Sequence, residues 1–369
     1  MQIETGMVRP DYDGACITGI VPALLERGSP AWMPSTVGGA STVVLFVLDG
    51  LGADVLEKYA DLLPNMRSFE SRTITSVVPS STASALPSLT TGLTPSEHGI
   101  VGYRMKVGPE VLNVLGWFRP GGGPPPDPAE AQPAPAFLGH QIKVVTRSQF
   151  LKSGFSEAHM RGARIIGWNV TSTMIEHCRR LAASGEPLVY AYYDGIDVVA
   201  HRYGLQNEFF LEELKEADRL VGALLAALPS DAALLVASDH GQVHIGRKGW
   251  VGLEPCDPYV QTYAGDGRFR LLYARAGAAM DLRKAAEQQF GDRAWVFTRE
   301  QLIEEGWFGP PPQSWVAERI SDVVLAARDP VAFIDPTNPL EVNLLSGHGS
   351  ITDDEMLVPL LAARGGRSG

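Results

Sequence analysis

Cysteine is scarce in this chain of 369 residues, which contains only Cys16, Cys178 and Cys256. The three lie far apart and form no CxxC or CxH spacing, so the sequence does not predict a zinc site built from thiolates. An odd number of cysteines without a disulfide framework is typical of a reducing compartment. We therefore expect a cytoplasmic protein.

Basic residues are also in deficit. The chain has 31 Lys and Arg but 42 Asp and Glu, so its formal net charge is -11 at pH 7. Nothing in the sequence supplies an extended basic face, so nucleic-acid duplexes and anionic membranes are not expected as partners. A small anionic substrate stays open, because a bound metal ion can reverse the local field.

Long apolar runs are missing as well. No stretch reaches the about 18 apolar residues that a membrane-spanning helix needs. Residues 1–5 show neither the basic nor the apolar region of a signal peptide. We expect neither a membrane span nor a signal peptide.

The sequence does contain short apolar runs that alternate with helical patterns. Residues 42–48, 188–193 and 232–237 are rich in β-branched and apolar side chains and are predicted to be buried strands. The spacing of apolar residues predicts helices over 53–63 and 207–228. Together these patterns predict an α/β fold with a mostly parallel, doubly wound central sheet and helices on both faces.

The length exceeds that of one ordinary core, so we expect a single large domain over 1–369 with a smaller inserted region. Residues 119–136 are rich in proline and glycine, and this composition predicts an exposed loop. From roughly 249 to 339 the pattern is mixed, and we expect an inserted or cap subdomain there.

Aspartate and histidine recur where predicted strands end, and once more between two glycines near the C-terminus. The residues are Asp49, Asp197, His201, Asp239, His240 and His348. Because the carboxyl ends of parallel strands meet at one edge of a sheet, these side chains are expected to converge. They are enough for two divalent metal sites about 4 Å apart, as in enzymes of phosphoryl transfer.

The adjacent pair Asp239 and His240 shows why a metal is the favoured partner. Burying a carboxylate and an imidazole at the end of a core strand is costly unless both are satisfied. A divalent ion satisfies both. Any one of these groups alone could cap a turn or lie on a helix face, and only their joint occurrence favours metal binding.

Thr82 is the candidate nucleophile. It lies between a predicted strand and a predicted helix, at a position that suits an N-cap, where free N–H groups and the helix dipole favour an anion. A hydroxyl is a poor nucleophile at neutral pH unless a base or a metal activates it. Taken alone, Thr82 would be interpreted as an ordinary cap.

Five stretches together resemble the nucleotide pyrophosphatase/phosphodiesterase family of the alkaline phosphatase superfamily. They are VVLFVLDGLG at 43–52, VVPSSTASALPSLTTGLTPSEHGIVGY at 77–103, DGIDVVAHRYG at 194–204, ASDHGQ at 237–242 and GHGSITDDEMLVPLL at 347–361. The set is specific, although no single piece is. The resemblance implies a hydrolase that acts on phosphate esters or nucleotides.

The resemblance also implies two metal sites. One would consist of Asp49, Thr82, Asp239 and His240, and the other of Asp197, His201 and His348. Zinc is the usual occupant of both sites in this family, with manganese as the alternative. The implied mechanism is double displacement, in which Thr82 attacks phosphorus and a phosphothreonine intermediate is then hydrolysed.

One position departs from the family pattern. Many members have an asparagine three residues after the nucleophile that donates to the phosphoryl group, and this chain has Ala85. Ser84, a backbone N–H or a more distant side chain must then take that role. His244 and Tyr103 are further candidates for substrate contacts, as is Trp117, whereas His98 is expected to be structural.

Several alternatives stay open at this point. They are a phosphomonoesterase, a phosphonate hydrolase, a relative of cofactor-independent phosphoglycerate mutases, and a non-catalytic, metal-binding remnant of the fold. A sulfatase is not expected, because neither Cys-x-Pro-x-Arg nor Ser-x-Pro-x-Arg occurs. The physiological substrate and the oligomeric state are not indicated.

Overall fold

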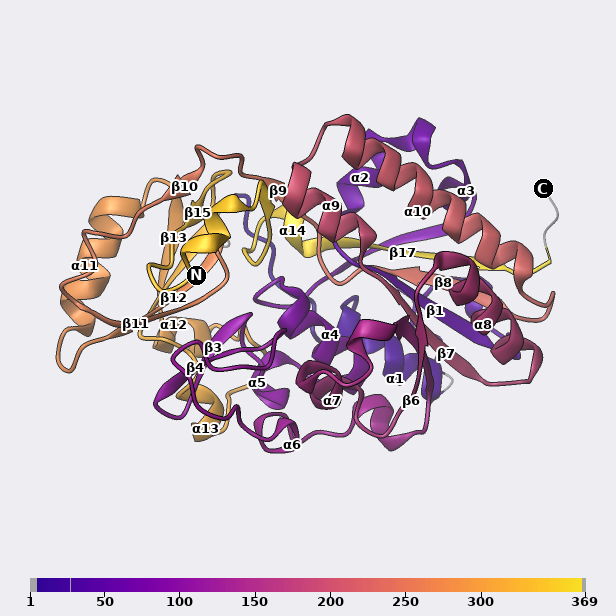
Figure 1. Ribbon diagram of the computed structural model, residues 1–369, viewed down its shortest axis with the longest axis horizontal. Coiled ribbons are helices and arrows are strands. Elements are labelled where there is room, and N and C mark those ends of the chain that lie inside the picture. The colour runs from indigo at the N-terminus through magenta and orange to yellow at the C-terminus, as the bar shows by residue number, and fades with distance from the viewer. Residues whose placement is uncertain (1–4, 27, 367–369) are drawn as a thin grey trace.

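The computed structural model describes residues 5–26 and 28–366, and a seven-stranded sheet forms its centre (Figure 1). In order across the sheet the strands are β2 (Glu70–Thr75), β17 (Leu357–Arg364), β8 (Ala233–Ala237), β1 (Val43–Leu48), β7 (Leu188–Tyr193), β5 (Lys143–Arg147) and β6 (Arg164–Trp168). Strand β17 is antiparallel to both of its neighbours, and the other pairs are parallel. The prediction of a mostly parallel central sheet is therefore confirmed.

Helices cover both faces of this sheet, as Figure 1 shows. The helices are α1 (Ile20–Leu25), α2 (Ala53–Lys58), α3 (Pro64–Arg67), α4 (Thr82–Thr91), α5 (Pro95–His98), α6 (Pro128–Ala131), α7 (Gly154–Met160), α8 (Thr171–Ala183), α9 (Gly195–Tyr203), α10 (Glu208–Ala227), α11 (Ala279–Phe290), α12 (Arg299–Glu304), α13 (Ser314–Ala317) and α14 (Asp353–Met356). Short 3-10 turns are η1 (Ile17–Gly19), η2 (Ser35–Val37), η3 (Ala60–Leu62), η4 (Ala136–Gly139), η5 (Ser148–Phe150) and η6 (Pro339–Asn343).

Strand β1 explains why the apolar runs in the sequence are continuous. Leu45 and Val47 face a core shared with α1, α4 and α7, while Val44 and Phe46 face one shared with α8 and α10. A strand that is buried on both faces has no place for a polar side chain. The same double burial applies to β7 and β8.

A second, antiparallel sheet lies at one end of the molecule, on the left of Figure 1. In order across it the strands are β11 (Val260–Gly265), β12 (Phe269–Ala274), β14 (Val323–Ala327) and β13 (Ala294–Thr298). One face packs against α11, and the other face joins the main core. This lobe lies within the range 249–339, and it shares its core with the large sheet.

Three further strand pairs each form a two-stranded sheet. They are β3 (Arg104–Val107) with β4 (Glu110–Asn113), β9 (Val243–His244) with β16 (Ser346–Gly347), and β10 (Trp250–Val251) with β15 (Ala332–Phe333). Within residues 5–26 and 28–366, none of the helices combines the length and the apolar character that crossing a bilayer requires.

The proline-rich range 119–136 differs in part from the exposed loop that its composition predicts. Residues 120–125 are exposed, but α6 follows, with Ala129 N–H donating to the side chain of Asp127. Gln132 is buried and donates to the backbone oxygen of Ala158 in α7, at 2.7 Å. The side-chain cap at Asp127 and the buried amide of Gln132 thus hold the second half of the segment against α7.

Candidate metal centre

The carboxyl ends of β1, β7 and β8 deliver most of the candidate ligands to one place. The three strands are neighbours in parallel register, with Leu48 level with Tyr193 and Val47 level with Ala237. Asp49 follows β1 directly, Asp197 lies in the first turn of α9 after β7, and the Asp239–His240 pair follows β8. The expected convergence at one edge of the sheet is what the structure shows.

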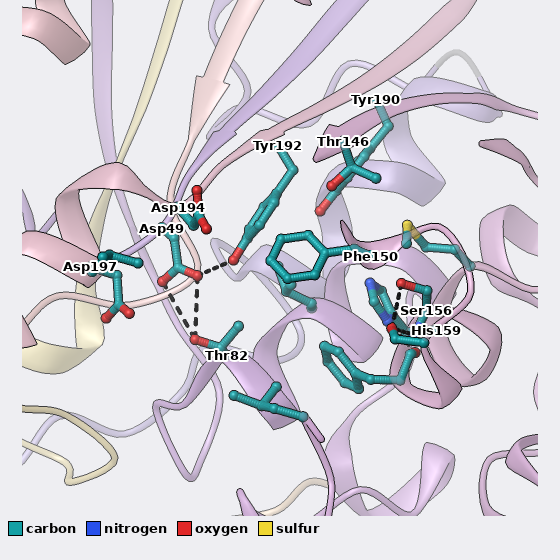
Figure 2. A pocket seen from close by; sticks show the side chains of 16 residues that line it. Asp49, Thr82, Thr146, Phe150, Ser156, His159, Tyr190, Tyr192, Asp194 and Asp197 are labelled. Atoms are coloured by element: carbon teal, nitrogen blue, oxygen red, sulfur yellow. Dashed lines mark hydrogen bonds between the residues drawn. The ribbon is translucent and has the colours of Figure 1, made fainter. Parts of the chain in front are cut away.

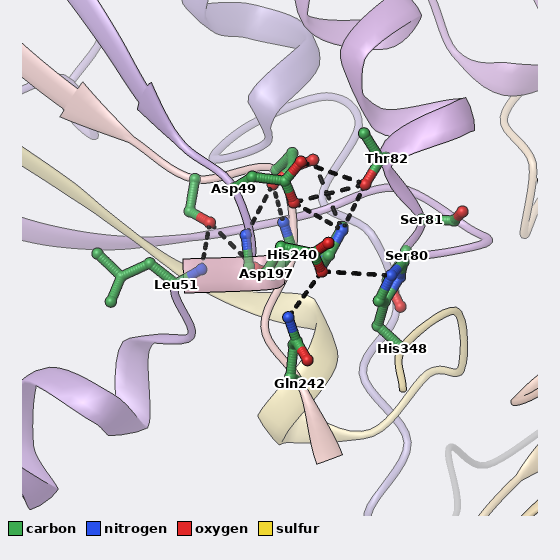
Figure 3. A network of polar contacts seen from close by, with 12 residues as sticks. Asp49, Leu51, Ser80, Ser81, Thr82, Asp197, His240, Gln242 and His348 are labelled. Carbon is green, nitrogen blue, oxygen red and sulfur yellow. Dashed lines mark hydrogen bonds and ion pairs between the residues drawn. The ribbon is translucent and has the colours of Figure 1, made fainter. Parts of the chain in front are cut away.

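One group of side chains surrounds Thr82, as Figure 3 shows. Thr82 Oγ1 lies 2.9 Å from His240 Nε2 and 3.4 Å from Asp49 Oδ1. His240 Nε2 is 3.3 Å from Asp49 Oδ1 and 3.6 Å from Asp239 Oδ2. Asp49, Asp239 and His240 are all buried and can direct their ligand atoms at a single ion.

The second group is formed by Asp197, His201 and His348. Asp197 Oδ1 lies 3.3 Å from His201 Nε2 and 3.7 Å from His348 Nε2, and the two histidine nitrogens are 3.2 Å apart. The rings of His240 and His348 stack with their centroids 3.6 Å apart, so the two groups are adjacent. The two predicted ligand sets therefore lie side by side.

Backbone carbonyls determine which nitrogen of each histidine carries the proton. Nδ1 lies 3.0 Å from Gly241 O in His240, 2.9 Å from Ser346 O in His201, and 3.0 Å from Ser80 O in His348. A carbonyl oxygen only accepts, so each neutral ring has its proton on Nδ1. Each Nε2 then directs a lone pair into the centre, as a metal ligand does.

The electrostatics of the centre also favour a cation. Asp239 Oδ2 is buried and has no hydrogen-bond partner among the described residues. Burial and the negative charges of Asp239 and Asp197 raise the pKa of Asp49 well above its usual value. Burial and the neighbouring His240 and His201 hold the pKa of His348 well below its usual value.

The donor set therefore fits two divalent ions. Carboxylates that repel one another and imidazole lone pairs that face one another are both unfavourable until a positive charge lies between them. An oxygen and nitrogen donor set without thiolates suits zinc and also manganese.

Three polar residues that the sequence analysis did not single out support the ligands. Tyr192 OH donates to Asp49 Oδ2, and Gln242 Nε2 donates to Asp197 Oδ1 at 2.7 Å. Ser346 Oγ in turn donates to Gln242 Oε1 at 2.5 Å. Gln242 lies in the quoted stretch 237–242, whereas nothing in the alternation of β7 marks Tyr192.

Thr82 is the first helical residue of α4, and the N-cap that we expected it to be is Ser81. Ser81 Oγ donates to Asp266 Oδ1 at 2.8 Å. This buried carboxyl lies in the turn between β11 and β12, 185 residues from Ser81. The capping position is thus tied to the lobe, and Thr82, the candidate nucleophile, lies against the candidate ligands Asp49 and His240.

The candidate substrate contacts are only partly brought to the site. Ser84 is buried two residues after Thr82, which at about 100° per helical residue turns it to the far side of α4. His244 accepts a hydrogen bond from Leu205 N at 3.2 Å and lines neither of the cavities at the centre. Neither side chain lines the two cavities at the centre, and their roles as substrate contacts stay predictions.

Other aromatic and imidazole candidates lie as follows. Tyr103 lines a cavity at the centre, and its OH accepts from Asn113 Nδ2. Trp117 is buried and donates to Pro126 O, away from both cavities. His98 is buried, and its Nε2 lies 2.8 Å from Ser88 Oγ, as expected of a structural histidine.

Two cavities meet at Thr82 from different sides. The smaller, of about 190 Å³, has Phe150, Phe155 and Tyr192 in its walls, and Figure 2 shows it beside Asp49 and Thr82. The larger, of about 590 Å³, extends from Thr82 toward the lobe and includes all three members of the second ligand group. Asp197 and Leu115 line both.

The fold and this centre define a class, the phosphate-ester hydrolases with an alkaline phosphatase-like sheet. A model of the family "type I phosphodiesterase / nucleotide pyrophosphatase" matches residues 43–115 and 118–350. The chain therefore belongs to this family, within the alkaline phosphatase superfamily.

Solved structures show the same fold at low identity. The murine ectonucleotide pyrophosphatase/phosphodiesterase 5 superimposes with a TM-score of 0.69 and 17% identity over 88% of each chain. Phosphonoacetate hydrolase from Sinorhizobium meliloti 1021, solved with phosphonoformate, gives a TM-score of 0.63 and 18% identity over 90% of this chain and 92% of the other.

A curated relative matches over a short stretch. The human GPI ethanolamine phosphate transferase 3, catalytic subunit, is 30% identical over 81 residues. This stretch is 22% of the present chain and 7% of the human protein. The chain thus aligns with only a small part of that relative.

Proposed function

We propose that the protein is a metal-dependent phosphodiesterase of the nucleotide pyrophosphatase/phosphodiesterase type that acts through a covalent intermediate on Thr82. The observation that carries the proposal is that two cavities share Thr82 in their walls, beside both ligand groups. A phosphodiester has two organic groups on phosphorus and needs a place for each. A monoester has one, and would leave one cavity without a role.

Two divalent ions, zinc or manganese, would be held by this chain's own residues. The ligands of one would be Asp49, Thr82, Asp239 and His240, and those of the other Asp197, His201 and His348. Bound ions supply charge stabilisation to the phosphoryl group and lower the pKa of the attacking hydroxyl.

The rest of the mechanism follows from the position of Thr82. With His240 Nε2 engaged as a ligand, the acceptor within reach of the Thr82 proton is the Asp49 carboxylate, at 3.4 Å from Thr82 Oγ1. The oxygen bonds to phosphorus, the bond to the leaving alcohol breaks, and the alcohol departs with a proton taken from water. A second water then cleaves the phosphothreonine ester and restores Thr82. The N–H groups at the start of α4 favour the anion throughout.

The test uses bis(4-nitrophenyl) phosphate and the metal-loaded protein. Thr82→Ala should lower kcat at least about 10³-fold, because the covalent route is lost. Wild-type protein quenched during turnover should carry a phosphoryl adduct on the peptide that contains Thr82. Thr173→Ala, an exposed threonine near the start of α8, is the matched control and should retain full activity.

Turnover measurements combined with metal analysis separate this proposal from its alternatives. Equal turnover by wild type and Thr82→Ala would overturn the assignment of the nucleophile. Stoichiometric metal without turnover of any phosphodiester would favour a non-catalytic protein, and faster turnover of 4-nitrophenyl phosphate than of the diester would favour a monoesterase.

A further inference from the structure

The larger cavity is the place for the leaving group. In an in-line displacement the leaving oxygen lies opposite the attacking Thr82 Oγ1, across phosphorus. All three members of the second ligand group line the larger cavity, whereas only Asp197 of that group also lines the smaller one. The group that stays on phosphorus is then directed to the smaller cavity.

The walls and the rim of the larger cavity are mainly apolar. Tyr103, Ile245, Trp250 and Leu344 line it. Phe118 and Leu340 also line it and are 49% and 76% exposed, so apolar side chains face solvent at its mouth. Exposed apolar side chains that surround a pocket are typical of sites for apolar ligands.

No free cation lines this cavity. Among its described lining residues Arg268 is the one arginine, and no lysine occurs. Arg268 is 1% exposed, and its Nε and Nη2 both donate to Glu355 at 2.8 Å. Its Nη1 donates to the backbone oxygens of Asp329 and Val331 at 2.8 Å. All three guanidinium nitrogens of Arg268 thus donate to acceptors within the protein.

The charged groups that remain in the cavity wall are acidic. Glu341 accepts from Arg270 Nη2 at 2.6 Å and is neutralised by it. Asp266 accepts only from Ser81 Oγ and the backbone N–H of Tyr103. Burial raises the pKa of Asp266 to about 6, so this carboxyl is largely ionised at pH 7.5. The ion that the second ligand group would hold is common to both kinds of substrate. Beyond it, a phosphate or pyrophosphate leaving group would meet the Asp266 carboxylate and no free lysine or arginine among the described lining residues.

We propose that the larger cavity selects an uncharged, largely apolar leaving alcohol and discriminates against leaving groups that are themselves phosphates. The inference rests on the proposed phosphodiesterase activity and narrows its substrates to diesters of such alcohols. Pyrophosphate-type substrates of the kind that the family name includes are then poor substrates for this member.

The test compares two substrates with the same retained group. Phenyl 4-nitrophenyl phosphate releases 4-nitrophenol, and phenyl diphosphate releases phosphate, a leaving group of similar basicity. For the wild-type protein we expect kcat/KM to be at least 100-fold higher for the diester. A ratio within threefold would overturn the proposal.

A charge inserted at the rim tests the cause. Leu340→Lys adds a cation at an exposed position outside the catalytic machinery and should shift the ratio at least tenfold toward phenyl diphosphate, with Leu340→Gln as the neutral control of similar length. An unchanged ratio in Leu340→Lys would also contradict the proposal. If neither substrate is hydrolysed, the phosphodiesterase assignment itself fails, which is a different result from equal turnover of both.

Discussion

At the scale of single residues, the centre depends on hydrogen bonds that hold the ligands in place. Tyr192 donates to Asp49 Oδ2, which also lies 3.5 Å from Thr82 Oγ1, and three carbonyls fix the histidine tautomers. Such partners typically change metal affinity by 10- to 100-fold when they are removed.

Tyr192→Phe should therefore weaken metal binding by about 10- to 100-fold, because Asp49 Oδ2 loses its donor. Chelator competition measures this directly, and activity at saturating metal should fall much less. Tyr193→Phe is the matched control, since Tyr193 OH donates to Glu213 on the other face of β7. Equal losses in both variants would contradict the role given to Tyr192.

The strand-end residues were predictable from the sequence, and their supporting partners were not. Asp49 and Asp239 each follow an unbroken apolar run, which is a local signal. Asp266 lies between two glycines and has the appearance of an ordinary turn residue. Its importance comes from contact with Ser81 across 185 residues, which no periodicity encodes.

At the scale of elements, the central strands were predictable because they are buried on both faces. Strands β5 and β6 are not evident from the sequence, since they are short and begin or end on the basic residues Lys143, Arg147 and Arg164, and β6 is the edge strand of the sheet. Helix α6 was missed because four helical residues after Asp127 lie inside a proline-rich segment. Edge strands and short capped turns depend on their neighbours more than on their own composition.

The turn after β8 requires a glycine for a steric reason. A Cβ on Gly241 would lie 2.0 Å from Asp354 O and 2.9 Å from Gly52 Cα. Gly241→Ala should therefore destabilise the fold by at least about 2 kcal/mol and displace the adjacent His240. Thermal unfolding measures the loss. Gly121→Ala, where a Cβ would meet nothing within 4 Å, should leave the melting temperature unchanged.

The contact between α4 and α5 makes stability sensitive to acid. Burial holds the pKa of His98 at about 3, well below the about 6.5 that is usual for histidine. Between these pH values His98 is protonated in the unfolded chain but stays neutral in the folded chain. The free energy of unfolding therefore falls as the pH falls. This loss of folding free energy is small above about pH 7 and grows as the pH falls below 7.

We expect His98 to account for about 2 kcal/mol of the stability lost between pH 7 and pH 5. Urea unfolding of His98→Gln at the two pH values should show a loss smaller by this amount, whatever the variant's stability at pH 7. His140→Gln, at an exposed position, should show the wild-type loss. Parallel losses in all three proteins would mean that His98 titrates normally.

At the scale of the whole molecule, the proposed metal binding would be coupled to folding, because the candidate ligands come from distant segments. Without ions, Asp49, Asp197 and Asp239 repel one another in a buried space. Metal at 100 times its dissociation constant should add about 2.7 kcal/mol per site to the free energy of unfolding. Calorimetry with and without chelator measures the shift.

Asp239→Asn gives this prediction a sharper form. The Asn oxygen can still accept from Gly50 N and His240 N, as Asp239 Oδ1 does, while one buried negative charge is removed. The metal-free variant should melt above the metal-free wild type and should gain much less on adding metal. If the metal-free variant melts lower, carboxylate repulsion is not what limits the stability of the metal-free protein.

The position of β17 has a consequence for biosynthesis. This strand, at residues 357–364, lies between β2 and β8 and forms ladders with both. On the ribosome the chain emerges from its N-terminal end, so β2 has no β17 beside it until residues 357–364 have been made. His348, which precedes β17, arrives equally late. The sheet and the candidate metal centre are therefore completed together, only after residues 348–364 have been translated.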